Sequence, residues 1–273
     1  MNNMGNMNNM GNTGNIGNTG NIGNTDNTGN TDNAGNMNAK VWYLYNSGFA
    51  VRTAEHFLIF DYWKQGSKGT GLEEGAIDPA ALKEYDVIVF VSHNHGDHYS
   101  REILKWGSII PKLRFVLSED IPSVPGALMV RQGMKLSLND FQLETLESND
   151  EGVAFVVDID GLRIYHAGDL NWWHWEGEPD DYNEGMAETY KSQVDLLRGR
   201  SIDLAFVPVD PRLGEQYAWG INYLMGAVDV RHVVPMHFGN DDYIVDWLLN
   251  DEVSLGYRER IIKLVKRGAS AEI

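Results

Sequence analysis

Cysteine is absent from the 273-residue chain, which excludes disulfide bonds and thiolate metal ligands. Basic residues are scarce, because 22 Lys and Arg stand against 39 Asp and Glu and leave a formal net charge of −17. This charge repels phosphate backbones and argues against a nucleic-acid substrate. Apolar runs long enough to cross a membrane are missing too. We therefore expect an acidic, cytoplasmic protein that binds neither nucleic acid nor a membrane, with a homo-oligomer left open.

The first 38 residues contain 15 Asn and 8 Gly, with no aromatic residue and only two charged ones. Proline is also absent there, so the three-residue period of this segment does not predict a collagen helix. A segment this polar cannot bury enough apolar surface to offset its chain entropy. The sequence predicts a disordered Asn/Gly-rich tail over residues 1–38 and one folded domain over residues 39–273.

Long helical patterns are few, and short runs of aromatic and branched residues take their place in the rest of the chain. Residues 41–45, 56–62 and 86–92 are examples of runs that predict β-strands. Helical patterns, such as residues 181–200, gather in the second half of the chain. Many short strands with a few helices favour stacked sheets that are covered on the outside by helices.

The hexapeptide HNHGDH holds three histidines and one aspartate within six positions. His93 and His95 follow a predicted buried strand and point to the same side, because side chains alternate along a strand. Gly96 is expected to allow a sharp turn that brings Asp97 and His98 to the same point in space. A polar loop with adjacent histidines is the alternative. The spacing favours a site for a divalent metal ion, which is zinc by preference and otherwise manganese or iron.

The hexapeptide resembles the H-x-H-x-D-H signature of the metallo-β-lactamase superfamily. Two further motifs recur in the expected order, YHAGDL with Asp169 and VVPMHFG with His237. The resemblance spans most of residues 40–240 and is closest to the branch of ascorbate-phosphate lactonase-like and related metal-dependent hydrolases. It implies an α+β fold, a four-layer αβ/βα sandwich, with one or two divalent ions bridged by Asp169. The metal ligands that it implies are His93, His95, Asp97, His98, Asp169 and His237.

Members of this superfamily normally supply one more histidine between the first motif and the Gly-Asp motif. The corresponding stretch of this chain, LETLESNDEGVAF, contains none. His174 follows the Gly-Asp motif and His166 precedes it, and both are candidate replacements. An oxygen ligand from Ser148, Asn149 or Asp150 is a further alternative, as is a weak first metal site.

The resemblance implies a hydrolase in which a metal-bound hydroxide attacks a small ester, lactone or phosphorylated metabolite. Asp97 is then the catalytic residue that orients the hydroxide. Two other functions stay open. One is a ribonuclease Z-like nuclease or phosphodiesterase, which needs a basic groove that the sequence does not show. The other is a weakly metallated binding protein without catalysis.

Several side chains beside the motifs are expected to bind substrate. Arg212 suits a carboxylate or phosphate group, although an ion pair with Asp210 is an equal alternative. The tryptophans of the NWWHW stretch form either an aromatic wall over the metals or a plug beneath a loop. His56 and His232 are expected to be structural. The complete expected set is Trp172, Trp173, Trp175, Tyr99, Asp210 and Arg212.

Overall fold

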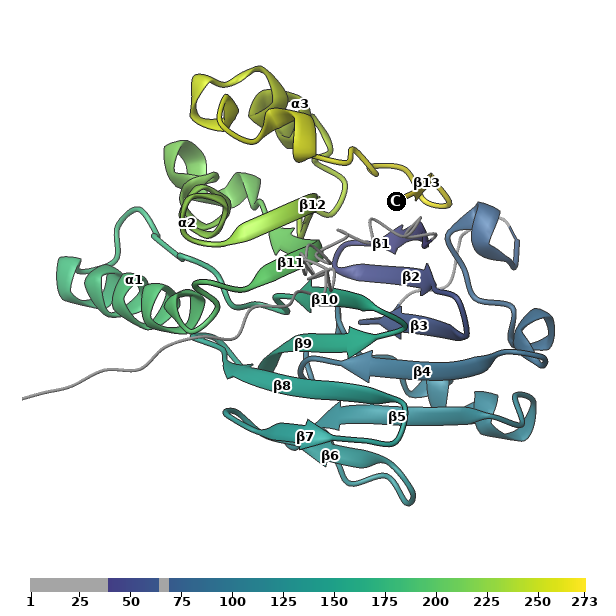
Figure 1. The fold of residues 1–273 in the computed structure, drawn as a ribbon. Helices are drawn as coiled ribbons and strands as arrows, with labels where there is room; N and C mark the ends of the chain where they lie inside the picture. The colour runs from purple at the N-terminus through teal and green to yellow at the C-terminus, as the bar shows by residue number, and fades with distance from the viewer. Residues whose placement is uncertain (1–38, 64–68) are drawn as a thin grey trace, which may run out of the picture. The chain divides into compact units, whose positions relative to one another are not determined.

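The computed structural model describes residues 39–63 and 69–273, and the tail expected over residues 1–38 lies outside them. The described part forms two mixed β-sheets that face each other (Figure 1). No helix in these ranges is long and apolar enough to span a membrane.

The two sheets and the helices have the following bounds. The first sheet runs in the order β13 (Ser270–Glu272), β1 (Lys40–Tyr45), β2 (Gly48–Arg52), β3 (His56–Phe60), β4 (Asp86–Val91), β5 (Leu113–Ser118) and β6 (Leu128–Val130). The second runs in the order β12 (Asp229–Met236), β11 (Ser201–Pro208), β10 (Leu162–His166), β9 (Val153–Ile159), β8 (Phe141–Glu147) and β7 (Lys135–Ser137). The α-helices are α1 (Asp180–Asp195), α2 (Trp219–Ala227) and α3 (Tyr243–Asn250). The 3-10 helices are η1 (Leu72–Glu74), η2 (Pro79–Leu82), η3 (Arg101–Ser108), η4 (Pro211–Gln216), η5 (Glu252–Ser254) and η6 (Arg258–Arg260).

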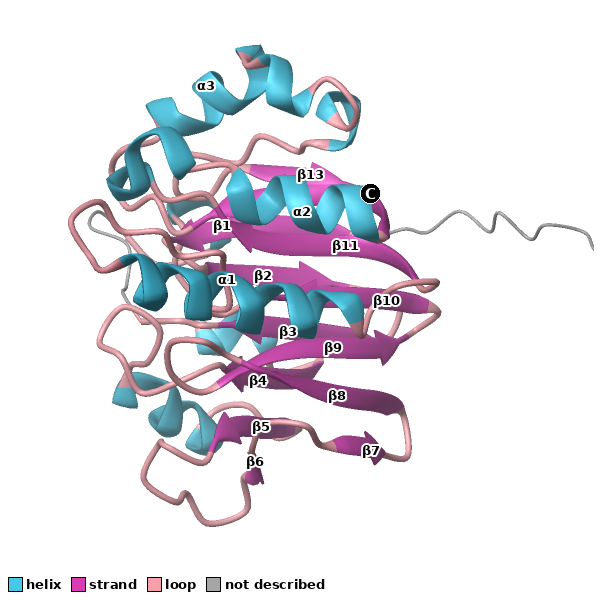
Figure 2. Ribbon diagram, turned by 90° about the vertical axis from the view of Figure 1, so that its left-hand side faces the viewer, coloured by secondary structure: helices cyan, strands magenta, loops and turns pink. Residues whose placement is uncertain are grey.

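Helices cover the outer faces of both sheets. Figure 2 shows α1 and α2 lying across the second sheet, where α2 contacts β11 and β12. On the first sheet, η2 and η3 bury Leu82, Ile103 and Trp106 in an apolar cluster with the strands beneath them. The result is the α+β, four-layer αβ/βα sandwich that the sequence predicts.

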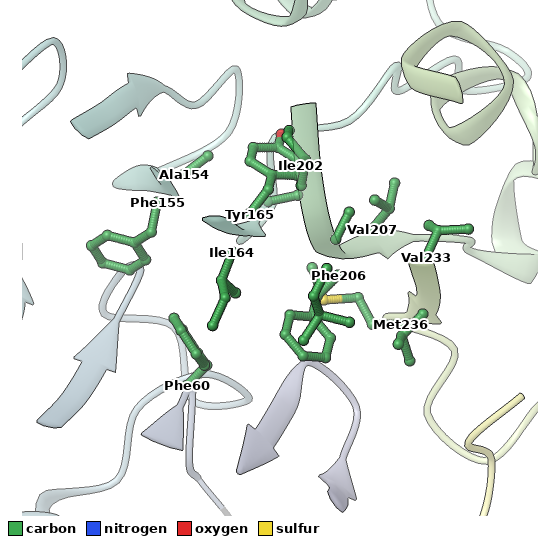
Figure 3. Packing of buried hydrophobic residues seen from close by; sticks show 14 of the residues in the cluster. Phe60, Ala154, Phe155, Ile164, Tyr165, Ile202, Phe206, Val207, Val233 and Met236 are labelled. Atoms are coloured by element: carbon green, nitrogen blue, oxygen red, sulfur yellow. The ribbon is translucent and has the colours of Figure 1, made fainter. Parts of the chain in front are cut away.

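The main apolar core fills the space between the two sheets. Phe60 of β3 and Phe206 of β11 come from opposite sheets, and their ring centres lie 6.0 Å apart (Figure 3). Phe155 of β9 meets Phe90 of β4 edge to face, with ring centres 5.4 Å apart. Large aromatic rings of this kind bury more apolar area than any other side chain, so they dominate the attraction between the sheets.

Parallel strands bring the polar motifs to one edge of the sandwich. β4 runs parallel to β3 in the first sheet, and β10, β11 and β12 run parallel to one another in the second. The hexapeptide follows β4, the Gly-Asp motif follows β10, and His237 follows β12. Loops at the carboxyl ends of such strands are the usual place for ligand sites. The fold therefore gathers segments that are far apart in the sequence.

Candidate metal centre

Asp169 lies at the centre of the gathered side chains. Its Oδ1 atom is 3.1 Å from Nε2 of His98 and 3.3 Å from Nε2 of His237. Its Oδ2 atom is 3.4 Å from Nε2 of His93. The two oxygens of one carboxylate therefore face two different groups of histidines.

The six residues that the motifs predicted as ligands fall into two groups. The first group consists of His93, His95 and Asp169, and the second of Asp97, His98 and His237. Within each group, one potential ligand atom per residue lies within 4.8 Å of the others. The structure thus brings all six predicted side chains together.

A buried aspartate, Asp61, orients the histidines of the hexapeptide. It accepts hydrogen bonds from the backbone N–H of Ser92 at 2.8 Å and from Nδ1 of His98 at 2.8 Å. The hydroxyl of Ser92 donates to Asp61 at 2.7 Å and lies 2.9 Å from Nδ1 of His93. A hydrogen-bond partner therefore holds Nδ1 of each histidine, and Nε2 of each points inward. Metal-binding histidines are usually held by an outer partner in this way. Burial alone would raise the pKa of Asp61, but the facing His166 and His98 hold it below its usual value.

Asp210 orients His237 in the same way. Its Oδ2 atom lies 3.0 Å from Nδ1 of His237, and the guanidinium of Arg212 binds the same carboxylate through Nε and Nη2. Burial alone would lower the pKa of His237, but the carboxylates of Asp169 and Asp210 raise it to about 9. The backbone of His237 has a φ of 65°, a conformation that costs a non-glycine residue energy and is found most often at functional sites.

Asn46, in the loop between β1 and β2, links Asp97 and His237 of the second group. Its side-chain amide donates to Oδ2 of Asp97 at 3.1 Å and accepts from the backbone N–H of Gly239 at 3.1 Å. Its backbone carbonyl accepts from the N–H of His237 at 3.3 Å. No sequence motif marks Asn46, and Asp61 lies within the run 56–62 that predicts only a strand.

The donor atoms fit a divalent cation. Nε2 of His98 and Oδ1 of Asp169 are buried and make no hydrogen bond with another described residue. Buried polar atoms are almost always partnered, so two that face each other without a bond mark the place of a missing ligand. Imidazole nitrogens together with carboxylate oxygens form the donor set that zinc, manganese and iron accept.

Comparison with known proteins finds a matching family. Residues 40–174 match the family described as Beta-lactamase superfamily domain. The chain is 24% identical over 217 residues to a UPF0173 metal-dependent hydrolase of Korarchaeum cryptofilum, covering 73% of this chain and 82% of that one. It is 26% identical over 218 residues to a UPF0173 metal-dependent hydrolase of Thermococcus onnurineus, covering 73% and 84% of the two chains.

The fold agrees with this match. A novel metallo hydrolase of the archaeon Ignicoccus hospitalis, Igni18, superposes with a TM-score of 0.57 at 15% sequence identity, over 87% of this chain and 99% of that one. The chain is similar to the metallo-β-lactamase superfamily in sequence and in fold. Its activity class is that of a metal-dependent hydrolase.

Neither histidine expected to replace the missing superfamily ligand reaches the centre. Nε2 of His166 lies 2.9 Å from the carbonyl oxygen of Ser47, and its Nδ1 accepts from the N–H of Gly168 at 3.2 Å. His174 instead packs its ring against Trp219, with ring centres 4.9 Å apart. The expectation for His166 and His174 is therefore corrected. Backbone groups bind both ring nitrogens of His166, and the ring of His174 packs against Trp219.

Of the three oxygen-bearing alternatives, only Asp150 faces the centre. The hydroxyl of Ser148 accepts from the N–H of Asp150, and the amide of Asn149 donates to backbone carbonyls. Asp150 lines the same cavity as His95 and Asp169. Burial raises the pKa of the Asp150 carboxyl, and the negative charge of Asp169 raises it further.

A cavity of about 350 Å³ opens over the metal centre. Trp173 and Trp175, two of the expected substrate-binding residues, stack with ring centres 5.5 Å apart and form one wall. Arg212 forms another part of the wall, with its guanidinium carbon 5.4 Å from the ring centre of Trp175. The residues that line the cavity are His95, Asp97, Asp150, Asp169, Trp173, Trp175, Tyr182, Met186, Arg212 and His237.

The other three expected substrate-binding residues are not among those that line this cavity. Trp172 packs against Trp219, with ring centres 5.1 Å apart, and so follows the alternative of a plug beneath the loop. Tyr99 packs against the apolar cluster of the first sheet. Asp210 is buried, and its carboxylate binds His237 and Arg212. Their expected roles are corrected to packing for the two rings and to orientation of His237 for Asp210.

The turn in the hexapeptide does not depend on special glycine angles. The carbonyl of His95 accepts hydrogen bonds from the N–H groups of His98 and Tyr99, at 3.1 and 3.0 Å. Gly96 is not among the described residues with positive φ, and an added Cβ would meet no atom within 4 Å. The turn predicted at Gly96 is present at residues 96–98, but it does not need the backbone angles that favour glycine. The centre does require Gly168, with a φ of +54° and a Cβ position only 2.8 Å from Cβ of Ser92, and Gly152, with a φ of +68° and a Cβ position only 2.5 Å from Cβ of His93.

A third group of possible ligands lies at the opposite edge of the sandwich, at the amino ends of β3 and β4. It consists of His56, Asp86 and Asp140. The guanidinium of Arg114 already binds Asp86 at 2.8 Å and Asp140 at 2.6 Å. A cation of the chain itself thus neutralises these carboxylates, which agrees with the structural role expected for His56.

Proposed function

We propose that the protein hydrolyses a small ester, lactone or phosphorylated metabolite at a binuclear centre of divalent ions. The observation that carries this proposal is the position of Asp169. Its Oδ2 lies 3.4 Å from Nε2 of His93 and its Oδ1 lies 3.1 Å from Nε2 of His98. A carboxylate that faces two separate donor groups suits two ions about 3.5–4 Å apart.

Zinc is our first candidate for the ions because four of the six proposed ligands are histidines, and manganese and iron are the alternatives. Bound ions of this kind polarise a carbonyl or phosphoryl oxygen and lower the pKa of water from about 15.7 to about 7. No serine or cysteine nucleophile is then needed. The cytoplasmic location and a homo-oligomer stay predictions.

Asp97 is proposed to be both a ligand and the residue that orients the attacking water. Asn46 holds its Oδ2 atom at 3.1 Å, and Oδ1 makes no hydrogen bond with another described residue. The carboxylate lies on the cavity wall, so Oδ1 is free to accept a proton from water. A positioned carboxylate of this kind acts as a general base when it is within hydrogen-bond reach of that proton.

Arg212, Trp173 and Trp175 are proposed to hold the substrate. Asp210 engages Nε and Nη2 of Arg212, which leaves Nη1 for an anionic group of the substrate. The two stacked indole rings offer an apolar surface of the kind that small-molecule sites use to exclude water. A substrate with an apolar body and one carboxylate or phosphate would match this wall.

A nuclease or phosphodiesterase of the ribonuclease Z type is the second candidate. Arg212 is the single Lys or Arg among the described residues that line the cavity. A nucleic-acid backbone requires several basic contacts. The charge of the cavity wall therefore favours a small substrate over a polymeric one. The third hypothesis is a weakly metallated binding protein, and metal analysis distinguishes it from a metal-dependent enzyme.

The test is a hydrolase screen with metal-free protein to which zinc, manganese or ferrous iron is added. Esters, lactones, thioesters, phosphodiesters and β-lactams are supplied, and turnover is expected with at least one class. His95→Ala is expected to lower kcat/KM by at least ~10³-fold because it removes a ligand. His232→Ala, a matched substitution on β12 outside the cavity, is the control. Full turnover by His95→Ala, or absence of metal-dependent turnover across the screen, contradicts the proposal.

A further inference from the structure

The two donor groups differ in their carboxylates. The second group has Asp97 as a carboxylate of its own, beside His98 and His237, and shares Asp169. The first group has His93 and His95 and only the shared carboxylate. One donor is therefore missing from the first group, at the place where members of the superfamily carry a histidine.

The nitrogens of His95 show which side of this group is open. Nδ1 of His95 lies 3.0 Å from Nε2 of His93, so Nδ1 points into the group. Nε2 of His95 points the other way and lies 3.4 Å from the carboxylate of Glu151. Glu151 is thus the outer partner of His95, as Asp61 is of His98. It does not face the inner side, where the fourth donor is needed.

Asp150, the neighbour of Glu151, does face that side. It lines the cavity together with His95 and Asp169. Asp150 is exposed to solvent at the cavity, whereas Asp61 and Asp210 are buried and their carboxylates bind histidines. Asp150 is outside the group of His93, His95 and Asp169, whose ligand atoms lie within 4.8 Å of one another, so its side chain has to turn toward them to become a ligand.

The loop that carries Asp150 is fixed on both sides. The amide of Asn149 donates to the carbonyls of Asn171 at 2.8 Å and Met186 at 3.0 Å. Beyond Asp150, the N–H of Val153 donates to the carbonyl of Ser92 at 3.0 Å. The loop is therefore anchored to the chain after Asp169 and to the residue before His93. Such anchoring fixes the backbone of Asp150 beside the first group before a metal binds.

We propose that Asp150 is the fourth protein donor of the first metal position, in place of the superfamily histidine. This inference rests on the metal centre of the proposed function. Each ion then receives two imidazole nitrogens, one carboxylate of its own and one oxygen of Asp169. The two donor sets become alike, and three carboxylates face two ions.

An oxygen donor in place of a nitrogen donor changes the metal preference. Carboxylates suit manganese and ferrous iron, and imidazole suits zinc and other metals late in the divalent series. The ratio of the zinc affinity to the manganese affinity is therefore expected to be lower in the wild-type protein than in an Asp150→His variant. This ratio measures the donor itself and does not depend on any substrate.

The experiment is calorimetric titration of chelator-treated, full-length protein with manganese and with zinc. Wild type is expected to bind two equivalents. Asp150→Ala is expected to keep one, with the other weakened by more than ~100-fold, which exceeds the ~10–100-fold cost of losing an outer partner. Asp150→His is expected to restore two equivalents and to raise the zinc-to-manganese affinity ratio by at least ~10-fold.

Two further variants separate Asp150 from its neighbours. Glu151→Gln is expected to keep two equivalents at lower affinity, because Glu151 contacts only the outer nitrogen of His95. Glu147→Gln, at the exposed end of β8, is the control for charge removal and is expected to match wild type. Circular dichroism and thermal melting of the metal-free variants establish that each one is folded.

Two equivalents of unchanged affinity in folded Asp150→Ala would overturn the inference and leave the proposed hydrolase intact. A single equivalent in wild type would overturn it as well. Two equivalents in wild type and one in Asp150→Ala, without hydrolysis of any substrate, would support the inference and contradict the proposed function. A wild-type protein that binds no metal would overturn both.

Discussion

Nδ1 of His98 lies 2.8 Å from Oδ2 of Asp61, and both side chains are fully buried. Asp61 also accepts two hydrogen bonds from Ser92, so three donors converge on one carboxylate. The position of the hexapeptide therefore depends on a residue that follows a different strand, β3.

Asp61→Asn should weaken metal binding without removing a ligand. An amide has only one acceptor oxygen, so at least one of the three donors loses its partner. We expect metal affinity to fall ~10–100-fold and the free energy of unfolding to fall by about 1–3 kcal/mol. Metal titration and urea unfolding measure the two effects. Asp181→Asn on the exposed start of α1 is the control, and equal affinities for Asp61→Asn and wild type would refute the prediction.

Arg212→Gln should affect anionic substrates selectively. The substitution removes the only Lys or Arg among the described cavity-lining residues and leaves the proposed ligands in place. We expect KM for a substrate with a carboxylate or phosphate to rise by at least ~10-fold, as for the loss of a charge-assisted hydrogen bond. KM for a matched neutral substrate should change little. Arg198→Gln, an exposed site on the turn after α1, serves as control.

An equal rise of KM for charged and neutral substrates would contradict this role of Arg212. It would indicate that the substitution acts through Asp210, which is shared with His237. Metal content of the variant separates the two explanations, because a disturbed His237 lowers metal affinity and a lost substrate contact does not.

His56 should make stability depend on pH. Its Nδ1 lies 2.9 Å from Asp160 and its Nε2 lies 3.0 Å from Asp140. Burial alone would lower the pKa of His56, but these two carboxylates raise it above 6.5. A raised pKa in the folded state means that the stabilisation is complete below about pH 6.5 and is lost as pH rises through the folded value.

The measurement is urea unfolding of metal-free wild type and His56→Gln between pH 5.5 and 8.5, roughly the range in which histidine titrates. The difference in the free energy of unfolding between the two proteins should shrink as pH rises. His232→Gln provides the same substitution without the two carboxylates. A difference that stays constant with pH, or that grows, would show that His56 is not charged in the folded protein.

Gly168→Ala should destabilise the fold, and Gly96→Ala should not. Alanine at Gly168 combines a positive φ with a Cβ that would lie 2.8 Å from Cβ of Ser92 and 2.9 Å from the carbonyl oxygen of Val153. We expect a loss of about 1–3 kcal/mol in the free energy of unfolding. Gly96 has open space at the Cβ position. Thermal melting of the two variants compares them, and a larger loss at Gly96 would reverse the assignment.

Local patterns predicted the metal-binding hexapeptide at the end of a buried strand, whereas the four-layer fold and the roles of Asp169 and His237 followed from the resemblance of three ordered motifs to a known superfamily. Buried strands, a glycine-containing turn and three ordered motifs are visible in one chain. Arg212 on the cavity wall was predicted for the same reason, since it follows a buried strand. The roles of Trp172 and Tyr99 could not be predicted, because which side of a loop packs against its neighbours is decided by residues distant in sequence.

The residues that hold the outer nitrogens of the histidines could not be predicted either, because their contacts also join segments distant in sequence. Asp61 precedes the hexapeptide by about thirty positions, and its contact with His98 exists only because β3 and β4 are neighbours. Asp150 and Glu151 are adjacent acidic residues with the same local pattern. Only the direction of the two nitrogens of His95 distinguishes the inner side from the outer one.

The proposed ligands are divided between the two sheets. His93 and His98 follow a strand of the first sheet, while Asp169 and His237 follow strands of the second. Neither sheet on its own carries a full donor set, so the centre forms only once the ribosome has released the chain beyond His237 and the two sheets have docked. Metal uptake would then be a late event in the biogenesis of the protein, and bound metal would distinguish finished molecules from partly assembled ones.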